Sequence, residues 1–172
     1  HDVLAQVVLV AYSEAFASRV EAEIERLLGV LPRADTTRAA LANSRVVLVG
    51  TDDEAAEAAN AYASEHLIIQ TRDPRGLATR VRHAGSIFLG PWTPEAAGDY
   101  AAGPNHALPT AGAARAYGGV TVEMFQKTTT MLELTQQSLE TLGPVVEGLA
   151  ALEGLDAHRL AMALRRKRKI DG

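Results

Sequence analysis

The first half of the sequence alternates short apolar runs with longer segments of helical periodicity. The apolar runs are rich in β-branched residues and have the length of strands, and their nearly continuous hydrophobicity is typical of burial on both faces. We expect strands over 6–12, 46–50, 66–70 and 86–90, and helices over 14–28, 34–43, 51–63 and 74–83. This alternation predicts an α/β fold in which helices cover both faces of a parallel sheet.

Two of these helices carry recognisable start signals. Ser13 directly precedes the first helical segment and is a good N-cap residue, because its hydroxyl oxygen can accept a free backbone N–H. Thr51 and Glu54 have the spacing of a capping box ahead of the third helix.

The character of the sequence changes after residue 120. Residues 120–134 mix signals for a helical turn and a short strand, whereas leucines and valines after Thr135 recur at helical spacing. Breaks are expected near Gly143–Pro144 and Gly154. We therefore predict an α/β domain over 1–120 and a small, mainly helical domain over 121–172, with residues 110–119 as a flexible connection.

Composition narrows the classes of function. The chain has 172 residues, a formal net charge of −4 and no cysteine, which excludes a disulfide framework and a thiolate metal site. The apolar runs are too short to span a bilayer. The basic run at 165–169 lies at the end of a predicted helix, where cations interact favourably with the helix dipole. We expect neither a nucleic-acid partner nor a membrane partner.

One stretch, "GDYAAGPNHALPT" at 98–110, lacks both helical and strand periodicity. Asp99 and His106 within it offer an oxygen and a nitrogen ligand that suit zinc or a similar ion. No local ligand motif such as HExxH accompanies them. From the residues alone, a polar turn stays open as the alternative.

Other candidate groups are ambiguous on their own. Glu65 and His66 could supply acid–base chemistry near neutral pH, or could form an exposed loop pair. Glu153 and His158 flank "GLDA", where Asp156 is expected to cap the last helix and leave His158 on its surface. No glycine-rich phosphate-binding motif follows any predicted strand.

Taken together, "SEHLIIQT", "AGSIFLGPWTPEAAGDYAAGPNHALPT", "FQKTTT" and "EGLDAHRLAMALR" resemble histidinol dehydrogenase, in order along almost the whole chain. The resemblance implies zinc- and NAD-dependent oxidation of L-histidinol through L-histidinal to L-histidine, in the last steps of histidine biosynthesis. It also implies a homodimer with intertwined C-terminal domains, in the cytoplasm or in a plant plastid. This chain would be the C-terminal portion, beginning with the later half of a Rossmann-like domain.

The resemblance also assigns roles to matching residues. Glu65 and His66 match the catalytic pair, in which His66 takes the hydroxyl proton and Glu65 activates water for the aldehyde step. His1, Asp99 and His158 match zinc ligands, with His158 reaching the metal of the partner subunit. The substrate-binding positions are His1, His66, Asp99, His106, Glu153 and His158. No residue of this chain is expected to bind NAD.

The sequence departs from the family pattern in two respects. The NAD-binding domain and a glutamine ligand precede the position of His1 in family members, so we expect this segment alone to be inactive. Ser64 stands where proline is usual. Two other hypotheses stay open: a related zinc- and NAD-dependent dehydrogenase of another small alcohol, and a non-catalytic assembly module if the native chain is this short.

Overall fold

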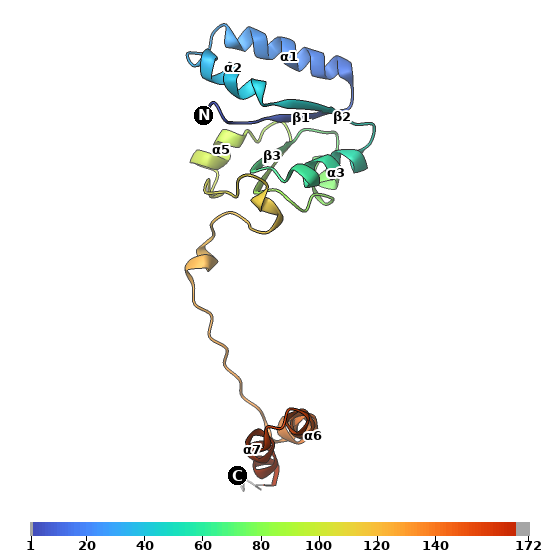
Figure 1. Ribbon diagram of the computed structural model, residues 1–172, viewed down its shortest axis with the longest axis vertical. Coiled ribbons are helices and arrows are strands. Elements are labelled where there is room, and N and C mark those ends of the chain that lie inside the picture. The colour runs from blue at the N-terminus through green and yellow to red at the C-terminus, as the bar shows by residue number, and fades with distance from the viewer. Residues whose placement is uncertain (1, 168–172) are drawn as a thin grey trace. The chain divides into compact units, whose positions relative to one another are not determined.

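The computed structural model describes residues 2–167. The chain divides into two compact units, His1–Phe125 and Gln126–Gly172. The first unit contains all the strands and five α-helices among the described residues, whereas the second contains two α-helices (Figure 1). The fold is therefore mixed α/β followed by a small helical unit.

All four predicted strands are present, each shorter than its apolar run. Strand β1 (Val8–Ala11) pairs in parallel with β2 (Arg45–Leu48), and β3 (His66–Ile69) pairs in parallel with β4 (Ser86–Leu89). In the second pair His66 lies opposite Ser86, and Ile69 lies opposite Leu89. Within the described residues, backbone hydrogen bonds join the strands as two separate pairs.

Five α-helices separate or follow these strands. They are α1 (Glu14–Leu28), α2 (Ala34–Ala42), α3 (Asp52–Tyr62), α4 (Pro74–Ala78) and α5 (Glu95–Tyr100). Figure 1 shows α1 and α2 on one side of the β1–β2 pair, and α3 with the second strand pair on the other. Two short 3₁₀ turns, Ala113–Arg115 and Val122–Phe125, complete the first unit.

Both predicted helix starts are confirmed. The Ser13 hydroxyl accepts the backbone N–H of Phe16 at 3.2 Å, and the Thr51 hydroxyl accepts that of Glu54 at 3.2 Å. The Glu54 carboxylate accepts the backbone N–H of Gly50 at 2.6 Å, so it reaches one residue beyond the N-cap. The two hydroxyl contacts satisfy donors that a helix leaves unpaired at its first turn.

The main core joins the two strand pairs to two helices. Its buried members are Val49, Ala55, Ala56, Ile69 and Leu77. They come from the residue after β2, from α3, from the end of β3 and from α4, and several side chains of all four strands pack around them. This core fixes β3 and β4, on which the candidate site is built.

The helix predicted over 74–83 ends early, at Ala78. The Asn60 side chain of α3 explains the difference, because it forms hydrogen bonds with backbone groups of residues 80–83 that a longer α4 would pair within the helix. Its amide oxygen accepts the backbone N–H groups of Arg82 (2.6 Å) and His83 (3.1 Å), and its amide N–H donates to the carbonyl of Arg80 (2.9 Å). Residues 80–83 are thereby tied to α3.

Residues 110–119, expected to form a flexible connection, are instead held against the first unit. Ala114 is buried, and the Arg115 guanidinium donates to the backbone carbonyl of Ala61 in α3. Residues 126–135 begin the second unit and have no regular secondary structure, and the structure assigns no strand within 120–134. The short strand predicted there was wrong.

The second unit is a hairpin of α6 (Gln136–Leu152) and α7 (Asp156–Lys167), separated at Gly154 with φ of +70°. The break predicted at Gly143–Pro144 was wrong, because α6 continues through Pro144.

The packing of Arg166 explains this continuity. The Arg166 side chain lies against Gly143, and its guanidinium pairs with Glu147 at 2.7 Å and Glu140 at 3.6 Å. Contacts on both sides of Pro144 hold together the turn in which the proline lacks a donor.

Other features of α7 also differ from the sequence pattern. Asp156 is the first helical residue rather than the cap before it, and its carboxylate accepts from the Arg159 side chain at 3.3 Å. Residues 168 and 169 of the basic run lie outside the described residues. Within residues 2–167, no helix combines the length and apolar character needed to cross a membrane.

Candidate functional site

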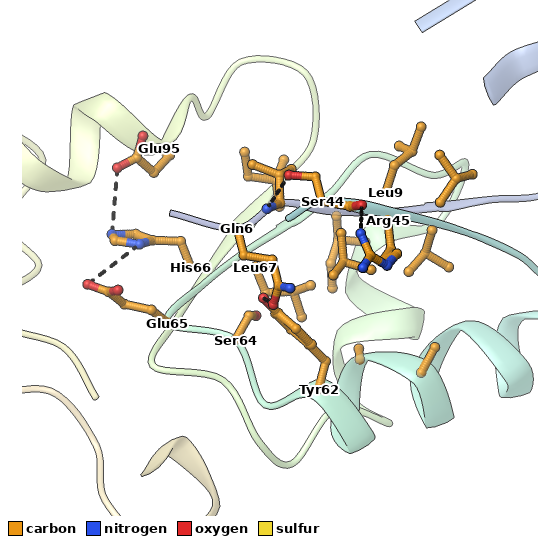
Figure 2. A pocket seen from close by; sticks show the side chains of 18 of the residues that line it. Gln6, Leu9, Ser44, Arg45, Tyr62, Ser64, Glu65, His66, Leu67 and Glu95 are labelled. Carbon is orange, nitrogen blue, oxygen red and sulfur yellow. Dashed lines mark hydrogen bonds and ion pairs between the residues drawn. The ribbon is translucent and has the colours of Figure 1, made fainter. Parts of the chain in front are cut away.

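The candidate site centres on His66, the first residue of β3. Its side chain is 24% exposed, and its two ring nitrogens face carboxylates on opposite sides. Nδ1 lies 3.9 Å from Glu65 Oε1, which is within ion-pair range but beyond a hydrogen bond. Figure 2 shows the ring between the carboxylates of Glu65 and Glu95. The adjacent Glu65 and His66 thus do serve one site.

Helix α5 supplies the carboxylates on the other side of the ring. His66 Nε2 lies 3.4 Å from Asp99 Oδ1 and 3.6 Å from Glu95 Oε1. Glu95 and Asp99 are four residues apart, so they occupy the same face of the helix. One ligand atom from each of His66, Glu95 and Asp99 lies within 4.8 Å of the others. The arrangement brings one nitrogen and two oxygen donors together.

The two α5 carboxyl groups influence each other. Partial burial raises the pKa of Glu95 above its ordinary value, and the hydrogen bond and negative charge of Asp99 raise it further, against the opposing effect of His66. A proton is therefore easier to keep on Glu95 than on an exposed glutamate. A proton on Glu95 would relieve the repulsion between the two carboxylates.

The backbone around Asp99 differs from the sequence expectation. Residues 98–100 were expected to be irregular, but they form the last part of α5, which begins after Pro94. The chain leaves β4 through Gly90, whose φ of +78° favours glycine, and α5 then lies over the strand pair. The site consequently lies at the amino end of β3 rather than at the carboxyl ends of the strands, where ligands of parallel sheets usually gather.

Four of the predicted residues, Glu65, His66, Asp99 and His106, border one cleft. His106 is exposed and lies in the irregular segment after α5. The cleft also reaches β1 and the start of α1, and its polar lining near His66 comprises Glu65, His66, Glu95, Asp99, Tyr100 and His106. The structure thus brings Glu65, His66 and Asp99 together, with His106 on the same cleft.

The other two described residues with predicted roles, Glu153 and His158, lie in the second unit. Glu153 is the C-cap residue of α6, and His158 is the third residue of α7; both are exposed near the turn of the helical hairpin. The prediction for His1 lies outside the described residues. These three assignments remain predictions.

Sequence reasoning missed two residues that contact His66. Glu95 was not singled out, although its i, i+4 spacing to Asp99 would have placed both carboxylates on one helical face. Phe88 stacks on the His66 ring, with the ring centroids 5.8 Å apart and an interplanar angle of 28°. Since residues i and i+2 of a strand share a face, the parallel register of β3 and β4 explains this contact.

The donor set is compatible with zinc. Carboxylate oxygens are common zinc ligands, and Glu95 and Asp99 hold such oxygens beside a cleft wide enough to admit a small substrate. The partly buried Asp99, with 17% of its side chain exposed, is the carboxylate most enclosed by the cluster. This chemistry fits an ion bound next to His66.

Comparisons with known proteins agree on one family. The family model described as histidinol dehydrogenase matches residues 1–166. The chain belongs to the histidinol dehydrogenase family.

Individual relatives show how much of the family protein this chain represents. It is 47% identical over 165 residues to a histidinol dehydrogenase of Bacteroides fragilis, covering 96% of this chain and 39% of the relative. It is 48% identical over 165 residues to one of Xanthomonas axonopodis pv. citri, covering 96% and 38%. The chain therefore spans about two fifths of the length of these curated relatives.

A solved structure supports the same assignment. The crystal structure of histidinol dehydrogenase from Elizabethkingia anophelis matches with a TM-score of 0.92 and 36% sequence identity, covering 97% of this chain and 39% of that one. The expected family resemblance is confirmed. The expected mixed α/β fold of the chain is likewise confirmed.

Proposed function

We propose that this chain is the C-terminal part of an enzyme that oxidises L-histidinol through L-histidinal to L-histidine, with zinc and NAD. The observation that carries the proposal is the environment of His66. Its ring lies beside a cleft and within 3.4–3.9 Å of carboxylate oxygens from Glu65, Glu95 and Asp99. Such surroundings suit a group that gains and loses a proton during the reaction.

His66 acts as the base for the alcohol step. When its neutral ring accepts the hydroxyl proton, the resulting imidazolium faces Glu65 through Nδ1 and the α5 carboxylates through Nε2. These negative groups stabilise the positive charge as it forms. NAD would be held by residues outside this chain and would supply the hydride acceptor.

Glu65 acts in the aldehyde step. Its side chain is 37% exposed, so water from the cleft can reach its carboxylate. A carboxylate at that position can accept a proton from water as the water attacks the aldehyde carbon. Because Glu65 and His66 are neighbours in the chain, both proton transfers occur at one place.

Asp99 is the zinc ligand of this cleft in the proposal, with His1 and the partner subunit's His158 as further ligands. Held by these residues, zinc would supply a positively charged centre able to bind the substrate's nitrogen atoms and so orient the alcohol. His106 lines the substrate pocket, and Glu153 of the partner subunit holds the substrate's amino group. The exposure of Glu153 and His158 at the hairpin turn leaves them accessible for such a role.

The same proposal covers the fold and assembly. The two parallel strand pairs belong to one Rossmann-like domain with helices on both faces, and the α6–α7 hairpin crosses to the partner in a homodimer. Several large apolar side chains of α6 are exposed in the single chain, among them Leu142, Val145 and Leu149. Burial of such side chains against a partner would be favourable.

The test is an assay of the full-length polypeptide that contains this chain. Purified, zinc-loaded protein should reduce two NAD molecules for each L-histidine formed from L-histidinol. Removal of zinc with a chelator should abolish the activity, and zinc should restore it. A zinc-loaded, folded protein that oxidises another small alcohol but not L-histidinol would contradict the proposed substrate and favour the related dehydrogenase.

A further inference from the structure

The position of the His66 ring is limited by a contact to one ring face as well as by the contacts of its nitrogens. One face stacks on Phe88, with the ring centroids 5.8 Å apart. Offset aromatic pairs at such separations are favourable. Phe88 is only 4% exposed, so its own ring has little freedom to move. The imidazole therefore rests on a fixed surface in the core.

Phe88 is in turn held by α5. A Cβ atom at Gly98 would lie 2.5 Å from Cε1 and 2.9 Å from Cζ of the Phe88 ring, closer than real Cβ contacts. Gly98 is buried and helical, and its φ is not in the region that requires glycine. The close approach to Phe88 is the reason that the structure gives for a glycine here.

A glycine inside a helix also has a cost. It is less favourable than alanine in a helix interior. Gly98 lies directly before Asp99, in the helix that carries the carboxylates facing His66. It lets α5 pack directly on the ring that supports the imidazole. At residue 98 the packing of α5 on Phe88 thus outweighs the helix propensity that would favour a residue other than glycine.

We propose that Phe88 and Gly98 are positioning residues for His66, an inference that rests on the proposed function of His66 as the base. Gly98 allows α5 to press on Phe88, and Phe88 fixes the plane of the imidazole between the carboxylate of Glu65 and those of α5. Neither residue touches the reacting atoms. Their effect is to hold the ring where it can accept the substrate proton.

The test uses the zinc-loaded, full-length enzyme with the change Gly98→Ala. To restore an ordinary contact of 3.4 Å from 2.5 Å, the Phe88 ring must move by about 0.9 Å. Misplacement of a catalytic group by about 1 Å can reduce the rate by about 100-fold. We expect kcat for histidinol to fall by about that factor, with KM changed less than threefold.

A second set of variants, in which Phe88 is replaced, distinguishes displacement of the Phe88 ring from a disturbance of the neighbouring Asp99. Phe88→Leu removes the ring edge that a Cβ at residue 98 would meet, and Phe88→Met serves if the leucine variant folds poorly. In either background, adding Gly98→Ala should lower kcat less than threefold. Gly118→Ala is the control, because its Cβ would meet no atom within 4 Å and its φ is ordinary. It should leave kcat unchanged within twofold.

Two kinetic results would overturn the inference. One is a Gly98→Ala enzyme with unchanged kcat. The other is an equal loss of kcat on adding Gly98→Ala to the enzyme with Phe88 and to the enzyme in which Phe88 is replaced, because that result would place the effect on Asp99. Crystal structures of the full-length wild-type and Gly98→Ala proteins give a readout that does not depend on activity. They should show displaced Phe88 and His66 rings. If the wild type does not oxidise histidinol, the proposed function fails, whereas unmoved rings refute the positioning inference itself.

Discussion

Replacement of His66 by glutamine tests the proposed base most specifically. Glutamine is polar and can keep a contact with the α5 carboxylates, because its amide N–H can donate to Asp99 or Glu95. It cannot accept and carry a proton near neutral pH. His66→Gln should therefore remove proton transfer while preserving most of the local packing.

The expected loss can be worked out from the role of the residue. A positioned general base contributes about 10²–10⁴-fold to a rate. At about 1.4 kcal/mol for each factor of ten, this corresponds to roughly 3–5 kcal/mol of transition-state stabilisation. Carboxyl groups within 3.4–3.9 Å of the ring nitrogens favour the imidazolium that forms, which is consistent with a contribution of this size.

The assay is steady-state NADH formation by full-length, zinc-loaded enzyme, with L-histidinol and then with L-histidinal as substrate. We expect kcat with histidinol to fall by at least 10²-fold and the zinc content to remain unchanged. The matched control is His83→Gln. His83 donates its backbone N–H to the Asn60 side chain at 3.1 Å. Because glutamine keeps this backbone group, kcat should stay within twofold.

A His66→Gln enzyme that retains kcat for histidinol within threefold of the wild type would refute the role of His66 as the base. A loss of zinc in the same variant would instead show that His66 is a ligand. Both results are distinguishable from misfolding by circular dichroism. The assignment therefore does not depend on activity alone.

Three further predictions concern the scaffold. Thr51→Ala removes the hydroxyl that caps α3, at a cost of about 1 kcal/mol, so hydrogen exchange of amides in α3 should accelerate about fivefold. Burial and the 2.5 Å hydrogen bond to Asp52 raise the pKa of Tyr12 to about 12. The folded state thus keeps a proton that the unfolded chain loses above about pH 10, and the free energy of unfolding falls as the pH rises from about 10 to about 12. The loss of unfolding free energy caused by Tyr12→Phe, measured by urea unfolding, should therefore be smaller at pH 12 than at pH 9. The buried Ser64 hydroxyl has no hydrogen-bond partner among residues 2–167, so Ser64→Ala should leave the urea midpoint unchanged or raise it, and a clear decrease would contradict this account.

The strands and helix starts were predictable because they depend on local chemistry. Apolar runs marked all four strands, and the Ser13 and Thr51 hydroxyls cap the helices that their positions indicated. Where long-range contacts decide, the sequence pattern was misleading. Asn60 ends α4 early by binding residues 80–83, and Arg166 supports α6 across Pro144.

The candidate site shows the same division. The motif containing Glu65, His66 and Asp99 could be found by resemblance, but their spacing in sequence does not show that they meet. Their proximity results from α5 lying over the strand pair, which depends on the contact between Gly98 and Phe88. Glu95 escaped notice because its role depends on a helix that the irregular composition of residues 98–110 concealed.

The most direct test of the central claim is zinc-edge anomalous diffraction from crystals of the full-length protein with bound L-histidinol. We expect a zinc peak about 2.0–2.2 Å from an Asp99 carboxylate oxygen, with His66 outside the coordination shell and its ring facing the substrate hydroxyl. A zinc ion coordinated by His66 would contradict its role as the base. A zinc site remote from Asp99 would contradict the proposed active site as a whole.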